Sequence, residues 1–173
     1  MSLPRRTVVT AAAGASTPGV PAGRHPGRQR LHPHSRGYGM ADSDYPVEDL
    51  PTPDPSYGAE RVVGIQLDAL GSNDDPIPNA GIGTAYNFAS PANRRQTGPL
   101  DRFVRMVEGP RYAPMIDHVE AVRGPLERDG RQARQTITLT GPDGRTATYE
   151  FGVSKRSGGR FDGCWLTDYV RVV

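Results

Sequence analysis

The stretch of sequence that decides the fold is QARQTITLTGPDGRTATYEFGVSK, residues 132–155. Two runs within it, 132–140 and 146–155, alternate between two classes of side chain, which is the period of a β-strand with one buried face. The buried face of the first run consists of Ala133, Gln135, Ile137 and Leu139, and that of the second of Ala147, Tyr149, Phe151 and Val153. Pro142-Asp143-Gly144 favours a tight turn between them. We therefore predict an antiparallel hairpin.

Two further runs extend this pattern in both directions along the chain. Residues 115–123 and 163–173 also have the period of strands, and Asp129-Gly130 and Gly158-Gly159 favour turns beside them. Three consecutive hairpins predict a four-stranded antiparallel sheet.

Upstream of residue 113 the apolar period is helical. We predict helices over 57–70 and 80–89 and a third that ends at Gly109-Pro110, with Pro99 in its first turn and residues 93–95 in a loop before it. The predicted N-caps are Ser56, Asn79 and Thr97. Helices followed by hairpins predict one α+β domain over 56–173.

One polar residue interrupts the apolar face of the first helix. Gln66 falls at the middle of a stripe formed by valine, isoleucine and leucine. Burying an amide without a partner costs about 1–3 kcal/mol, so this side chain has to meet a strand backbone or line a polar cavity.

The charge of the chain changes at Met40. Residues 1–39 hold six arginines and no acid, whereas 40–173 hold 15 basic and 19 acidic residues. A net acidic domain argues against a nucleic-acid partner. The single cysteine, Cys164, excludes an internal disulfide framework, and no apolar run is long enough for a membrane span.

The arm over 1–39 leaves three interpretations open. Arg5-Arg6 resembles a twin-arginine export signal, and an acid-free, arginine-rich arm is also typical of an organelle transit peptide. The favoured interpretation is a disordered arm or an extension upstream of a true start at Met40, which predicts a cytoplasmic protein. Residues 40–55 form an acidic, proline-rich lead-in that we expect to be extended or disordered.

Several short motifs occur in one order along residues 61–173. They are IQLDAL followed by ND within Val63–Asp74, Ala80-Gly81-Ile82, Phe88-Ala89-Ser90-Pro91, Phe103 with Met106-Val107, Tyr112 with Pro114, and Asp162-Gly163-Cys164-Trp165-Leu166. In this respect the chain resembles a family of small uncharacterised proteins known as domain of unknown function 4864. That family is similar in layout to the cystatin-like and nuclear transport factor 2-like cone. The resemblance implies N-terminal helices packed on a curved four-stranded antiparallel sheet, and it implies no activity.

A cone of this kind can hold a small, mostly apolar ligand between its first helix and the sheet. The side chains expected to face that space are Gln66, Tyr86, Gln135, Tyr149 and Trp165. The alternative is a filled core in which the amides bond to backbone. The leading hypothesis is a non-enzymatic binding or dimerisation module without a cofactor or a metal site, in which an exposed sheet face serves a homodimer.

An isomerase or dehydratase is the enzymatic alternative, and it requires an acid or base in the pocket. The candidates are Asp117 and His118, which are adjacent on the first predicted strand, so at most one faces inward. Arg94 and Arg95 are candidates for gripping phosphate, although nearby acids favour ordinary surface charge. Asp74, Asp75 and Asn79 are more typical of a solvated turn than of a cation site.

Overall fold

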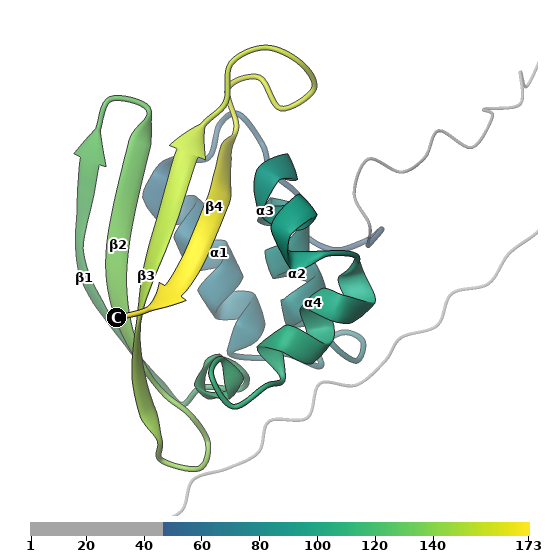
Figure 1. Cartoon of the computed structure of the whole chain (residues 1–173), viewed down its shortest axis with the longest axis vertical. Helices are drawn as coiled ribbons and strands as arrows, with labels where there is room; N and C mark the ends of the chain where they lie inside the picture. The colour runs from purple at the N-terminus through teal and green to yellow at the C-terminus, as the bar shows by residue number, and fades with distance from the viewer. Residues whose placement is uncertain (1–46) are drawn as a thin grey trace, which may run out of the picture. The chain divides into compact units, whose positions relative to one another are not determined.

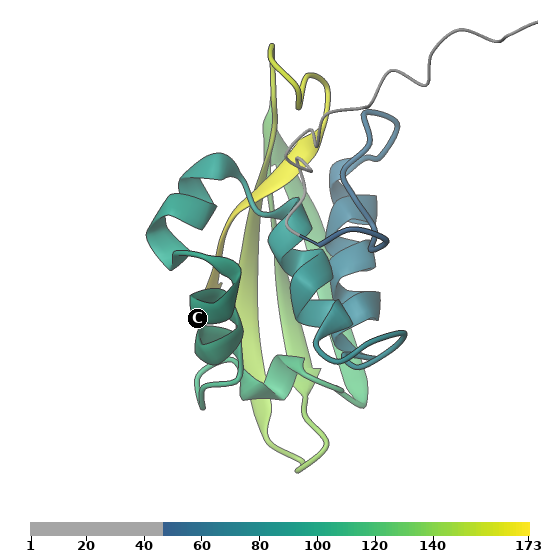
Figure 2. The ribbon, with the colours of Figure 1, turned by 90° about the vertical axis from the view of Figure 1, so that its right-hand side faces the viewer.

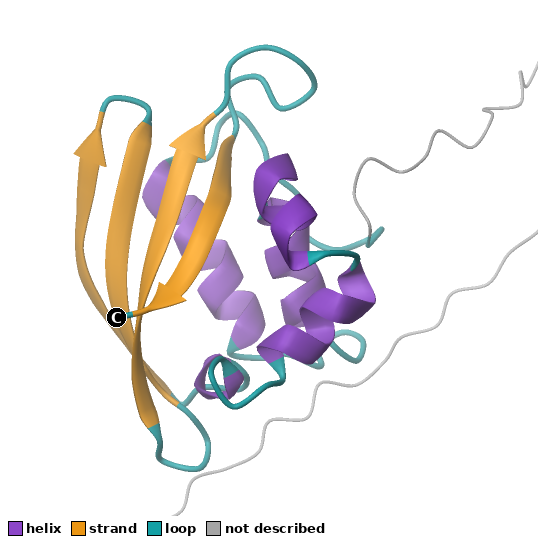
Figure 3. Ribbon diagram, in the orientation of Figure 1, coloured by secondary structure: helices purple, strands orange, loops and turns teal. Residues whose placement is uncertain are grey.

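Helices cover one face of an antiparallel sheet in the computed structural model, which describes residues 47–173 (Figures 1 and 3). The elements in chain order are α1 (Ala59–Leu70), α2 (Ala80–Phe88), α3 (Pro91–Thr97), α4 (Leu100–Val107), the 3₁₀ turn η1 (Ala113–Met115), β1 (Glu120–Asp129), β2 (Gln132–Thr140), β3 (Thr146–Lys155) and β4 (Trp165–Val172). Figure 2, turned by 90°, shows the helices in front of the sheet. The predicted α+β class is confirmed.

The sheet is a simple meander in the order β1-β2-β3-β4, with every neighbouring pair antiparallel. Ile137 lies opposite Tyr149, as the alternation in 132–155 requires. Gly130 and Gly144 adopt φ of 55° and 79° in the two tight turns, which a side chain would disfavour. The third connection is a longer loop over 156–164, in which Gly158-Gly159 is one part.

The core lies between α1 and the inner face of the sheet. Ile137, Leu139, Tyr149 and Phe151 are at most 1% exposed, and they pack with α1 in one cluster. The buried side chains of α1 include Val62, Val63, Leu67 and Leu70. Each such side chain stabilises the fold by about 1.5–3 kcal/mol through the area that it removes from water. The alternating stretch therefore supplies one half of the core and the first helix the other.

A glycine sets the close approach of α2 to the end of α1. A Cβ at Gly81 would lie 2.8 Å from the carbonyl carbon of Ala69 and 3.0 Å from Cα of Asn73. The backbone amide of Gly81 donates to the carbonyl of Asn73 at 2.9 Å. A bulkier residue would have to push the two backbones apart, because neither contact is with a flexible side chain.

The first strand starts later than the sequence predicted. Residues 113–115 form η1, and Asp117 has φ of 49°, which breaks the extended conformation before β1 begins at Glu120. A bulge between Arg123 and Leu126 accommodates Pro125 in this edge strand, where a missing amide hydrogen is tolerated. The period of two across 115–123 therefore predicted the strand about five residues too early, because β1 begins at Glu120.

The predicted loop over 93–95 is part of helix α3. Pro91 occupies its first turn and the Ser90 hydroxyl accepts a hydrogen bond from the amide of Asn93 at 3.2 Å, so serine followed by proline starts the helix. Thr97 therefore ends α3, and Pro99 is the N-cap of α4.

Two further boundaries differ from the predictions. Gly58 is the N-cap of α1, while the Ser56 hydroxyl donates to Asp54 at 2.5 Å. Asn79 precedes α2 without a side-chain cap bond. The described part of the lead-in packs against α2, because the Asn87 amide donates to the carbonyls of Val47 and Pro51 at 3.0 and 3.3 Å. Residues 1–39 and 40–46 lie outside the described range, so the predictions for the arm concern residues that the structure does not describe.

Replacing Gly81 with alanine should lower the free energy of unfolding by about 1–3 kcal/mol, because the new methyl group meets two backbones. Gly64→Ala in α1 is the matched control, since its Cβ would meet only the Arg123 guanidinium, at 3.2 Å from Nη1. Better helix propensity should leave that variant unchanged or stabilise it by up to about 1 kcal/mol. Urea unfolding of both variants measures the difference, and equal effects would contradict this account of the helix contact.

Candidate ligand cavity between the helices and the sheet

A cavity of about 230 Å³ lies between the helices and the part of the sheet formed by β3 and β4. Most of its wall is apolar: the side chains of Leu70, Phe103, Met106, Val107, Phe151 and Val170 line it. They come from α1, α4, β3 and β4, so four elements far apart in the sequence build one space.

Gln66 and Thr167 form the polar floor of this cavity. Nε2 of Gln66 donates to Oγ1 of Thr167 at 2.9 Å and to the carbonyl of Val62 at 2.9 Å. The Thr167 hydroxyl donates to Oε1 of Gln66 at 3.1 Å. Gln66 is 1% exposed and Thr167 2%. The buried amide finds its partners in the Thr167 side chain and the Val62 carbonyl, not in a strand backbone, and it also lines the cavity, which was the second predicted alternative.

The backbone of Thr167 ties β4 to α3. Its carbonyl accepts from the amide of Ser90 at 2.8 Å and from Nδ2 of Asn93 at 3.1 Å. A short parallel bridge also joins Ala89 to Thr167. The outer edge of β4 is thus satisfied by the chain itself at this point, and Asn93 is held at the cavity wall.

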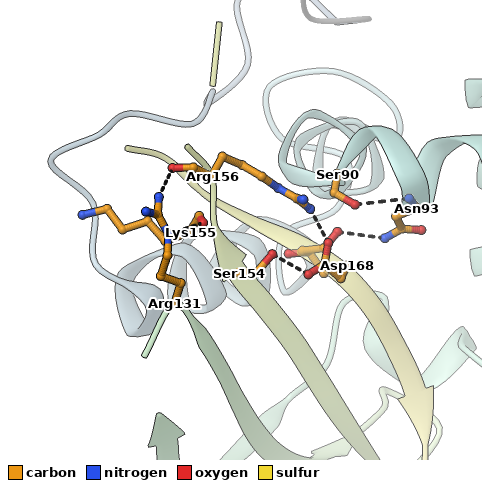
Figure 4. Close-up of polar contacts among 8 residues, drawn as sticks. Ser90, Asn93, Arg131, Ser154, Lys155, Arg156 and Asp168 are labelled. Atoms are coloured by element: carbon orange, nitrogen blue, oxygen red, sulfur yellow. Dashed lines mark hydrogen bonds and ion pairs between the residues drawn. The ribbon is translucent and has the colours of Figure 1, made fainter. Parts of the chain in front are cut away.

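Asp168 follows Thr167 at a bulge and also lines the cavity. Its carboxylate accepts from Oγ of Ser154 at 2.6 Å and pairs with the guanidinium of Arg156 (Figure 4). Arg131 supports this end of the sheet, because its guanidinium donates to the carbonyls of Lys155 and Arg156 at 3.2 and 2.6 Å.

Two stacked tyrosines lie beside the cavity, one in the loop before η1 and one in β3. The rings of Tyr112 and Tyr149 are stacked with centroids 6.0 Å apart, and Tyr112 lines the cavity. The Tyr149 hydroxyl donates to the carbonyl of Arg111 at 3.0 Å, and burial raises the pKa of Tyr149 to about 12. The phenol is therefore neutral at physiological pH and serves as a hydrogen-bond donor.

Of the five side chains expected to face a pocket, only Gln66 lines this cavity. The other four lie in the core. Tyr86 donates to the carbonyl of Gly98 at 2.9 Å, and Gln135 donates to the carbonyl of Gly124 at 2.8 Å. Tyr149 bonds as described above, and Trp165 is 2% exposed, with the Arg128 guanidinium 5.0 Å from the centre of its ring. The period of a strand or helix identifies the side chains that face inward, but it does not distinguish those that pack in the core from those that line a cavity.

Asp117 and His118 lie at the end of α1 and line no part of the cavity. The Asp117 carboxylate accepts from the amide of Asn73 at 2.9 Å, and its amide donates to the carbonyl of Leu70 at 2.8 Å. Nδ1 of His118 is 3.0 Å from the carbonyl of Met115. Both residues precede β1, so the prediction that they alternate along a strand is wrong; their contacts fix the loop beside α1.

The remaining candidates serve structural contacts. Arg94 donates to the carbonyls of Tyr86 and Asn87 at 3.1 and 2.7 Å, so it caps the end of α2. Asp74 accepts from Nδ2 of Asn73 and from the amide of Asn79, both at 2.8 Å, within its turn. Cys164 is buried, and burial raises its pKa. Across residues 47–173, no three histidine, cysteine or acidic side chains gather where they could hold a metal ion.

Sequence reasoning missed Asn93, Thr167 and Asp168. Asn93 was placed in a loop, and Thr167 and Asp168 are polar residues of an ordinary strand. The one signal in the sequence was the buried amide of Gln66, which needs a partner on a facing element. It did not identify that partner, since several polar residues of the sheet satisfy the same requirement.

A family model described as domain of unknown function 4864 matches residues 55–172. The match covers well over half of the chain, so the protein belongs to this family. Searches of curated proteins and of solved structures returned no match. The likeness to a cystatin-like or nuclear transport factor 2-like cone therefore stays a prediction. None of the helices in the described part has the length and apolarity to cross a membrane.

Replacing either member of the floor pair should destabilise the domain. Gln66→Leu leaves the Thr167 hydroxyl without its partner, and Thr167→Val leaves Oε1 of Gln66 without its donor while Nε2 keeps the Val62 carbonyl, so each should cost about 1–3 kcal/mol. The double variant should cost less than the sum, because an apolar pair leaves no polar atom unsatisfied.

Unfolding by urea measures all three variants. The control is Thr138→Val on the outer face, where the Thr138–Thr148 bond of 3.0 Å is partly exposed. It should change stability by less than about 0.5 kcal/mol. Strictly additive costs at 66 and 167 would show that the two side chains are not coupled.

Proposed function

We propose that this protein is a non-enzymatic module that binds a small, mostly apolar molecule in the cavity between the helices and the sheet. This proposal rests on the lining of the cavity. Its wall is mostly apolar, and the two polar side chains of its floor, Gln66 and Thr167, form hydrogen bonds with each other. Apolar cavities of about 150 Å³ already accept benzene, so the volume of about 230 Å³ suits a molecule with one substituted ring. Such a space favours apolar contact over charge.

The composition of the wall favours binding over catalysis. An isomerase or dehydratase requires a positioned acid or base in contact with its substrate. The original candidates, Asp117 and His118, lie outside the cavity. Asp168 is the charged side chain of the wall, and Ser154 and Arg156 already engage its carboxylate. The enzymatic alternative is therefore the weaker of the two.

The direct test uses p-xylene as the probe. Binding to the native state should raise the melting temperature of the full chain as the p-xylene concentration rises. Ala85→Phe, which places a ring at the cavity wall, should abolish the shift. Ala92→Phe on the exposed side of α3 is the matched control and should retain it. A wild-type protein that shows no shift at saturating p-xylene would refute the proposed function.

A second candidate function is self-association through the outer face of the sheet. No described residue covers this face, where Val122, Thr138, Thr148 and Val173 form a row across the four strands. Val122 is 57% exposed and Val173 61%. The row has no charge, so a two-fold axis through it brings no like charges together, and exposed apolar groups gain by burial.

Thr138→Arg should dissociate such a dimer, because the two-fold axis would place two guanidinium groups near each other. Light scattering at micromolar concentration should give the dimer mass for the wild type and the monomer mass for this variant. Ala92→Arg adds the same charge on a helix and should leave the mass unchanged. A monomeric wild type would contradict self-association and leave the ligand proposal intact.

A further inference from the structure

Asn93 brings a buried amide to the cavity wall with its orientation fixed. Its nitrogen donates to the carbonyl of Thr167 at 3.1 Å. A carbonyl only accepts hydrogen bonds, so the nitrogen has to face Thr167 and Oδ1 faces the other way. The residue is 8% exposed and lines the cavity.

Oδ1 of Asn93 accepts no hydrogen bond from any residue within 47–173. Its backbone groups are engaged, since the amide donates to Ser90 and the carbonyl accepts from the hydroxyl of Thr97 at 3.0 Å. Within residues 47–173, the enclosed side-chain atoms without a partner are Oε1 of Gln135 and Nε of Arg156, so Oδ1 of Asn93 is open to water or to a ligand. This oxygen therefore offers a place for a donor that the chain does not supply.

The other polar groups of the cavity leave little competition. Gln66 and Thr167 satisfy each other at the floor. Gln96 also lines the cavity, but it is exposed to solvent. Ser154 and Arg156 engage the Asp168 carboxylate. Among the buried amides and carboxylates of the described lining, Asn93 therefore has an oxygen that no other group engages.

The charge of the wall selects against anions. Asp168 contributes a carboxylate, and the lining residues that the structure describes include no lysine, arginine or histidine. A carboxylate or phosphate placed in the cavity would lose its hydration and would find no free cation there, because the Arg156 guanidinium already pairs with Asp168. Neutral ligands do not carry this cost.

We propose that the cavity is specific for a neutral, mostly apolar molecule with one hydroxyl or amine that donates a hydrogen bond to Oδ1 of Asn93. This inference rests on the proposed binding function and adds the chemical class of the ligand. The apolar body occupies the space among Phe103, Met106 and Phe151, and the donor occupies the side where α3 approaches β4.

Four para-substituted toluenes of nearly equal size test this assignment by calorimetric titration of the full chain. p-Xylene has no polar group, p-cresol has a donor, 4-methylanisole has an acceptor alone, and 4-methylbenzoate is an anion. p-Cresol should bind roughly fivefold more tightly than p-xylene, the gain typical of one buried hydrogen bond. 4-Methylanisole should show no gain, and 4-methylbenzoate should bind more weakly than all the others.

Variants at position 93 locate the effect. Asn93→Ala should remove the preference for p-cresol while p-xylene still binds, whereas Asn93→Asp keeps an acceptor and should keep the preference. Gln96→Ala removes a second amide of the wall and should leave the ratio unchanged. If a variant at position 93 fails to fold, the four wild-type titrations still test whether the cavity prefers a neutral ligand with a hydrogen-bond donor.

The outcomes separate the two proposals. Binding of p-xylene with equal affinity for p-cresol would overturn the donor assignment and leave the binding function standing. Failure of all three neutral ligands to bind the wild type would overturn the binding function itself. A preference that persists in Asn93→Ala would also overturn the role of Asn93.

Discussion

The hydrogen-bonded pair of Gln66 and Thr167 is the constraint on which the rest of the structure depends. It places an amide and a hydroxyl, each nearly without exposure, at the contact between α1 and β4. A purely apolar stripe tolerates several rotations of a helix on a sheet, because burial is non-directional. Two mutual hydrogen bonds select one rotation, since any other leaves buried polar atoms unpaired. The same residue of β4 holds α3 through its carbonyl, so three elements take their positions from one point.

This arrangement also divides the polar atoms of the cavity into those whose hydrogen bonds hold the fold together and those that remain free. The floor has polar atoms, but their hydrogen bonds are used to hold the fold. The wall formed by α4 and β3 is apolar. Under the proposed function, the amide that remains for a ligand belongs to α3, a seven-residue helix whose start depends on Ser90 and Pro91. In the proposed function, recognition and stability would therefore depend on neighbouring residues of different elements, so that one could change without the other.

The alternation in residues 132–155 was sufficient to predict the sheet, because a period of two over two adjoining runs is incompatible with a helix and rare in loops. Gln66 was predicted to be buried and paired because an amide in an apolar stripe is exceptional. The start of β1 was mispredicted, since a positive φ at Asp117 leaves no mark on polarity. Helix α3 was missed because its sequence, PANRRQT, has no apolar stripe and its cap is a single serine. Tyr86, Gln135, Tyr149 and Trp165 face inward as their periods indicate, but whether an inward side chain fills or borders space depends on neighbours that the sequence does not place.

The partners at the floor are 101 residues apart along the chain. During synthesis, α1 leaves the ribosome long before β4 exists, so its amide has no native partner while the first three strands emerge. A domain built in this way cannot close its core gradually from the N-terminus. The contact between α1 and β4 can form only once β4 is available, and such long-range contacts slow folding because the loop between the partners has to close first.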